Sequence, residues 1–222
     1  MEKSRFLVVG SAGLLAACIM GAPAAFASIL TPGTSAPPDM LMYGAGPTVA
    51  STSGTFTSVL GPTDFSGTYV EDVAKDPANT FGAGDLTWYI EVTNDSTSGH
   101  ALETVSASSF TGWMTDVGYT NTVVGVAPTT VSSGPSGSAI NFLFPAPGSI
   151  NPGDNTVLLT IMTNATTVKA GNISFIDNGT ATVAGFAPGV PEASTWAMLL
   201  LGFAGLGFAG YRTRQKAASI AF

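Results

Sequence analysis

Carboxylates are the residues of this chain whose type could support acid–base catalysis. A glycoside hydrolase needs two carboxyl groups about 5 to 10 Å apart, flanking the sugar bond that it cleaves. The candidates in the middle of the chain are Glu71, Asp72, Asp76, Glu91, Asp95 and Glu103. Their spacing selects no pair, so we expect a protein that is not an enzyme. A secreted hydrolase that acts on polysaccharide is the alternative.

Metal binding is the second chemistry that carboxylates support. Glu71, Asp72 and Asp76 lie close together in the sequence and could supply oxygen ligands to a structural calcium ion, although no EF-hand spacing is present. His100 is the only histidine, which excludes zinc sites that need two imidazoles, and we expect it in a loop. The sequence therefore predicts no cofactor, with structural calcium as the alternative.

Sugar binding by aromatic stacking is the third chemistry to consider. Trp113 in "FTGWMTDVGY", with Tyr119 nearby, is surrounded by glycine and polar residues. Two such rings on an open face could stack on pyranose rings. The alternative is that Trp113 anchors the hydrophobic core, and this alternative is favoured.

The elements that must position these residues are predicted to be β-strands. In "LTWYIEVTN", Leu86, Trp88, Ile90 and Val92 alternate with polar residues, the pattern of a half-buried strand. About nine such stretches, one of them around Val124, are separated by Gly, Pro, Asn and Asp turns. This arrangement predicts an all-β fold, an antiparallel β-sandwich, over residues 28–188. Residues 28–50 are rich in Pro and Gly and could form a loose lead-in.

Charge is scarce and unevenly placed. The formal net charge is −7, and the segment from Asp39 to Asp177 holds twelve carboxylates against two lysines, Lys75 and Lys169. An acidic surface of this kind repels phosphate backbones, so we expect no nucleic-acid partner.

The first 27 residues have the pattern of a secretory signal peptide. A basic start is followed by an apolar run, and Ala25-Phe26-Ala27 fits an A-x-A cleavage site that leaves Ser28 as the new N-terminus. Lipidation at Cys18, the only cysteine, is an alternative because residues 15–18 match a lipobox. An uncleaved membrane anchor is a weaker alternative. Export is common to the first two.

The last part of the chain has the pattern of a membrane helix. Residues 194–211 carry no charge and would rise about 27 Å as a helix, close to the thickness of a hydrocarbon core. Aromatic residues stand near both ends of this run, where interfacial aromatics belong. The basic residues that follow would remain in the cytoplasm by the positive-inside rule, and they are Arg212, Arg214 and Lys216.

The stretch from residue 189 to residue 216 resembles the PEP-CTERM sorting signal. The resemblance rests on Pro191-Glu192, on the Ser194-Thr195-Trp196 run, on the Gly-rich apolar segment and on the terminal basic cluster. Ala193 stands where the family usually has a second proline. The resemblance implies export by a Gram-negative, polysaccharide-producing bacterium and recognition by exosortase, which removes the C-terminal helix. Pro191 and Glu192 would then be the recognition residues.

Together these features predict an exported, non-catalytic protein of the cell surface or extracellular matrix. It would be anchored in the inner membrane as a precursor and then sorted by exosortase, as a structural or adhesive component of a polysaccharide biofilm matrix. A permanently membrane-anchored binding domain is an alternative. The sequence does not name the ligand of the sandwich.

Overall fold

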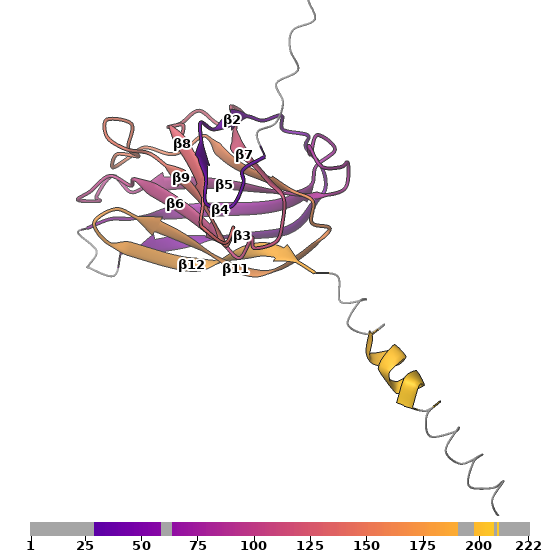
Figure 1. Ribbon diagram of the computed structural model, residues 1–222. Helices are drawn as coiled ribbons and strands as arrows, with labels where there is room; N and C mark the ends of the chain where they lie inside the picture. Colours follow the sequence, from indigo (N-terminus) through magenta and orange to yellow (C-terminus); the bar gives the residue numbers. More distant parts are fainter. Residues whose placement is uncertain (1–28, 59–63, 191–197, 207, 209–222) are drawn as a thin grey trace, which may run out of the picture.

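The computed structural model describes residues 29–58, 64–190, 198–206 and 208, and it confirms the predicted all-β class. The described strands form two six-stranded sheets (Figure 1). The first sheet has the order β2-β7-β10-β5-β4-β3, and the second has the order β1-β8-β9-β6-β11-β12. All pairings between these strands are antiparallel except the short parallel pairing of β2 with β7.

The strands differ widely in length, from two residues to ten. In chain order they are β1 (Ser35–Ala36), β2 (Asp39–Met40), β3 (Thr48–Thr57), β4 (Ser66–Lys75), β5 (Leu86–Asn94), β6 (Thr104–Ser108), β7 (Thr115–Thr120), β8 (Thr130–Ser133), β9 (Ala139–Leu143), β10 (Leu158–Thr163), β11 (Thr167–Ile176) and β12 (Thr180–Gly189).

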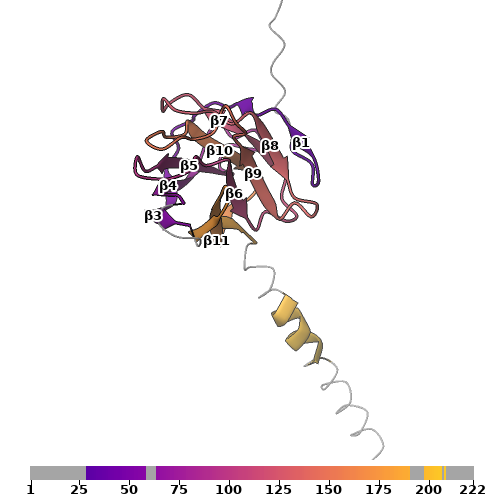
Figure 2. The same ribbon diagram turned by 90° about the vertical axis from the view of Figure 1, so that its left-hand side faces the viewer.

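The hydrophobic core lies between the two sheets, which face each other in Figure 2. As predicted, Trp88, Ile90 and Val92 of β5 are fully buried within the core. The other face of β5 is also largely buried, so this strand is not half-exposed as expected. Rings from both sheets meet there, and Phe56 of β3 stacks on Phe175 of β11 with centroids 3.9 Å apart. Burial of large apolar side chains, each contributing roughly 1.5 to 3 kcal/mol, is the main force that holds the sheets together.

The N-terminal segment is part of the fold. The sequence left open that residues 28–50 are loose, but within this range β1 pairs with β8 of the second sheet and β2 pairs with β7 of the first. Leu30 is buried in the core, and its backbone N–H donates to the carbonyl of Thr115. The segment therefore connects the two sheets at one side of the sandwich.

The strand predicted around Val124 is wrong. Residues 121–125 form turns and bends, and Val124 is 93% exposed. Short apolar runs do not distinguish a strand from a loop by periodicity alone. Conversely, β7 and β8 are strands that the sequence analysis did not identify.

The C-terminal strand ends where the predicted sorting signal begins. β12 extends to Gly189, and a short helix covers residues 198–206. No helix in the described part of the chain is long and apolar enough to span a membrane. The predicted span 194–211 lies partly outside the described residues, as do the predicted signal peptide and Ser28.

Candidate functional site

Three side chains from three separate loops meet at one end of the sandwich. Asp64 lies in the turn between β3 and β4, His100 in the connection between β5 and β6, and Asp177 in the hairpin between β11 and β12. We call these residues the His100 cluster. Among the described residues it is the one group of three or more His, Cys, Asp or Glu side chains whose geometry could hold a metal ion.

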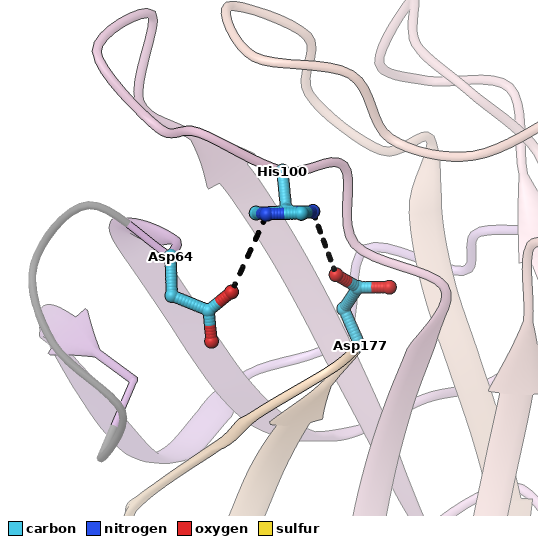
Figure 3. A group of neighbouring side chains, drawn as sticks. All are labelled: Asp64, His100 and Asp177. Atoms are coloured by element: carbon cyan, nitrogen blue, oxygen red, sulfur yellow. Dashed lines mark ion pairs between the residues drawn. The ribbon is translucent and has the colours of Figure 1, made fainter.

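The imidazole of His100 lies between the two carboxylates (Figure 3). Its Nε2 atom is 3.9 Å from Oδ1 of Asp64, and its Nδ1 atom is 3.6 Å from Oδ2 of Asp177. Both separations exceed the 2.7 to 3.2 Å of a nitrogen–oxygen hydrogen bond. One potential ligand atom from each side chain can be chosen so that all three lie within 4.8 Å of one another.

The two carboxylates are largely buried, whereas the imidazole is open to water. Side-chain exposure is 10% for Asp64 and 16% for Asp177, but 53% for His100. Oδ2 of Asp64 also accepts a hydrogen bond of 2.9 Å from the Ser58 hydroxyl. The cluster thus combines two enclosed carboxylates with an imidazole whose nitrogen atoms are accessible to a ligand.

Hydrogen bonds fix the loop that carries His100. Asn94, which is fully buried, donates through Nδ2 to the carbonyls of His100 and Ile150 at 3.0 and 2.9 Å. Ser66 holds the same loop by donating from its backbone N–H to Ser98 Oγ and from its hydroxyl to Asp95. A site held by such contacts is preorganised before any ligand arrives.

Sequence reasoning missed the His100 cluster, although it placed His100 in a loop. Asp64 and Asp177 are separated by more than one hundred residues, and only the order of the strands brings their loops together. Asp177-Asn178-Gly179 has the composition of a turn, but the sequence does not show which loops lie beside it. No motif at fixed spacing links the three residues.

A second group of polar side chains is buried inside the sandwich, unlike the His100 cluster. Glu71 of β4 is fully buried on the inner face of the first sheet, where its neighbour across the strands is Ile90. Its Oε2 atom accepts a 2.9 Å hydrogen bond from the backbone N–H of Phe186, in the edge strand β12. Two residues earlier on β4, the Tyr69 hydroxyl donates to the carbonyl of Ala184 at 2.9 Å. We call this contact between β4 and β12 the Glu71 seam.

The Glu71 carboxyl is held in its protonated form at neutral pH. Burial raises its pKa from 4.5 to about 8, the Phe186 N–H opposes this increase, and the charge of neighbouring Asp72 adds to it. Oε1 is buried and has no hydrogen-bond partner among the residues that the structure describes. Gly185 gives the carboxyl room, since a Cβ atom there would lie 2.7 Å from Oε2. The seam is built for contact with the backbone of β12 rather than for exchange with solvent.

The outer face of the first sheet buries further polar groups. Oδ2 of Asp116 accepts a 2.8 Å hydrogen bond from the Thr80 hydroxyl, and burial raises the pKa of this carboxyl from 3.8 to about 6. Asp76 accepts hydrogen bonds from the Tyr89 hydroxyl and from the backbone N–H of Ala78. Burial, followed by the contact with Asp76, raises the pKa of Tyr89.

The residues proposed for calcium are divided between the two faces of the first sheet. Glu71 and Asp72 are consecutive strand residues, so their side chains point to opposite faces of the sheet. Asp76 is buried against Tyr89 on the outer face. The described carboxylates that do gather are those of the His100 cluster.

The two aromatic residues proposed for sugar stacking pack against the core. Trp113 precedes β7 and Tyr119 lies within it, and both are partly buried. Among the sorting-signal residues, Pro191, Glu192, Ser194, Thr195, Trp196, Arg212, Arg214 and Lys216 all lie outside the described part of the chain, as do Ala25, Ala27 and Ser28.

Comparison of the chain with protein-family models, with curated proteins and with solved structures finds no significant match.

Proposed function

We propose that this chain is an exported, non-catalytic component of the cell surface or of a polysaccharide matrix, sorted by exosortase. The observation that carries the proposal is the position of the fold boundary. β12 ends at Gly189, two residues before the Pro191-Glu192 pair of the sorting signal. Every buried apolar residue of the described chain lies between Leu30 and Ala187. Cleavage near Pro191 would therefore release the complete sandwich.

The short helix at residues 198–206 supports a membrane-bound precursor. Its apolar side chains are exposed, among them Met198, Leu200, Leu201, Phe203 and Leu206. A contiguous apolar surface of this kind marks a segment that contacts a membrane or another protein. In the precursor we assign the bilayer as the environment of this segment.

The edge strand β3 supports an adhesive role. It carries no charge, and its exposed residues include Ser51, Ser53 and Thr55. These three residues face the same side, because their partners on β4 alternate with the inward-facing Tyr69 and Glu71. Hydroxyl groups both donate and accept hydrogen bonds, as the hydroxyls of a polysaccharide do.

Sorting is tested by the intact mass of the protein from cells with and without exosortase. We expect the mass to end near Pro191 only when exosortase is present. Glu192→Gln should block this cleavage, and Glu103→Gln, the same change on an exposed loop of the sandwich, should not. An unchanged mass running to Phe222 in both strains would overturn the proposal and leave a membrane-anchored surface domain.

Adhesion is tested by retention of the released protein on the polysaccharide of the producing cells. We expect retention of the wild-type protein and weaker retention after combined alanine substitution of Ser51, Ser53 and Thr55. Ser174→Ala combined with Thr182→Ala, which removes two exposed hydroxyls from the second sheet, is the matched control. Absence of retention at high protein concentration would contradict the adhesive role.

A further inference from the structure

We propose that Asp64, His100 and Asp177 form a binding site for a divalent transition-metal ion, of which Zn²⁺ is the representative probe. The three side chains offer one imidazole nitrogen and two carboxylate oxygens. Zinc accepts this mixed set of ligands, whereas calcium takes oxygen ligands. The inference concerns the loop end of the sandwich and does not depend on how the chain is sorted.

The side chains of the His100 cluster are spaced more like ligands around an ion than like hydrogen-bonded ion pairs. The 3.6 and 3.9 Å separations from the ring nitrogens leave a gap that no hydrogen bond fills. Around a tetrahedral zinc ion with bonds of about 2.0 to 2.1 Å, ligand atoms lie about 3.4 Å apart. One ring nitrogen and one oxygen of each carboxylate already lie within 4.8 Å of one another, so rotations of all three side chains would bring them to that separation. The second ring nitrogen would then face water or a carboxylate oxygen, the usual outer contact of a ligating histidine.

The charge of the site favours a dication. Asp64 and Asp177 together carry two negative charges, and the ion pairs in the described part of the chain involve His100 alone as the basic partner. A protonated imidazole supplies one positive charge between these two carboxylates. A divalent ion beside a neutral imidazole neutralises both.

Neighbouring residues hold the three side chains of the cluster in positions from which they can bind a metal ion. Ser58 orients the Asp64 carboxylate, and Asn94 fixes the backbone of His100. Phe65, next to Asp64, is fully buried and anchors that side of the site. The exposed face of His100 leaves room for water to complete the coordination, as in zinc sites that keep an open position.

The experiment is a calorimetric titration of the full chain, prepared without a polyhistidine tag and stripped with a chelator, with Zn²⁺ at about pH 7.5. We expect saturation at one ion per chain and a higher unfolding temperature with zinc. His100→Gln and Asp177→Asn should each weaken zinc binding by about tenfold or more, because loss of even an outer contact costs about that much. Glu103→Gln removes a charge near His100 without touching the cluster and should bind zinc as the wild-type protein does.

The dependence on pH and on the ion separates this site from a simple ion pair. Zinc binding should weaken as the solution is made more acidic, because metal ligands must be deprotonated to bind. Calcium should bind more weakly than zinc. Lack of saturation at about 1 mM zinc, or zinc binding that both cluster variants retain, would overturn the proposal. Unfolding curves of the metal-free variants verify that a lost signal is not lost structure.

Discussion

The His100 cluster and the Glu71 seam both place carboxylates where no lysine or arginine of the described residues pairs with them, yet they do so at opposite levels of exposure. The cluster joins three loops around an imidazole that is 53% exposed. The seam joins β4 to the edge strand β12 through a carboxyl that is fully buried. In the cluster the charge can be neutralised by an ion from solution. In the seam it is neutralised by a proton that remains bound at neutral pH.

This difference shows how burial assigns a role to a carboxyl group in a chain with few charges. A buried carboxyl that satisfies the backbone N–H of an edge strand contributes to the fold, and its ionisation opposes folding. A carboxyl beside a solvent-exposed donor adds little to stability and remains available to a ligand.

Glu71→Gln should have the largest effect, and the effect should depend on pH. Folding binds a proton to Glu71 between pH 4.5 and about 8, so the wild-type free energy of unfolding is highest below this interval and falls as the pH rises through it. The loss amounts to about 1.4 kcal/mol per pH unit at most. The glutamine amide cannot ionise and keeps an acceptor for the Phe186 N–H. We therefore expect the variant to be more stable than the wild type by roughly 3 kcal/mol at pH 7, and similar near pH 4.

Denaturant unfolding of both proteins across this pH range measures the difference directly. Parallel curves for the wild type and the variant would show that the seam is hydrated and that Glu71 ionises as it does in the unfolded chain.

Asp116→Asn extends the same test to the outer face of the first sheet. The pKa of Asp116 is raised from 3.8 to about 6, so its destabilising effect develops between these values and is complete at pH 7. We compare the free energy of unfolding of the variant with that of the wild type. This difference should shift in favour of the variant by up to about 3 kcal/mol between low pH and pH 7. The check is the same unfolding series. A variant less stable than the wild type at pH 7 would mean that the ionised carboxylate is needed by the Thr80 hydroxyl.

Tyr69→Phe should weaken the seam by about 1 kcal/mol, the usual net contribution of one hydrogen bond. It removes the donor to the Ala184 carbonyl and leaves the ring in the core, where it contacts Phe175. Because this change leaves the Glu71 carboxyl in place, the loss should be the same at pH 4 and at pH 7, and the variant is the control for Glu71→Gln. A loss that grows with pH would show that the tyrosine and the glutamate act as one unit.

The parts of the molecule that the sequence predicted are those governed by local alternation. β5 was predicted with its observed bounds because Trp88, Ile90 and Val92 recur every second residue. β7 was missed because it holds only two large apolar residues, and its Asp116 and Gly118 are of types that strands rarely contain. Asp116 is buried on the outer face, where it accepts a hydrogen bond from Thr80, 36 residues earlier in the chain. Both the cluster and the seam depend on contacts between distant strands. Glu71 gave no sign in the sequence that it would be fully buried.

His100→Gln, studied without metal, should change the free energy of unfolding least. It is also the most direct test of the difference between the His100 cluster and the Glu71 seam. The pairs that it breaks are longer than hydrogen bonds and involve a ring more than half exposed, so water and salt screen them. We expect the free energy of unfolding to change by less than about 1 kcal/mol at pH 7. The measurement is denaturant unfolding in the presence of a chelator, repeated with excess zinc. Only the repeat should separate the two proteins, because zinc would stabilise the wild type more than the variant. A loss of several kcal/mol already in chelator would make the cluster a structural tie between loops, equivalent to the Glu71 seam despite its exposure.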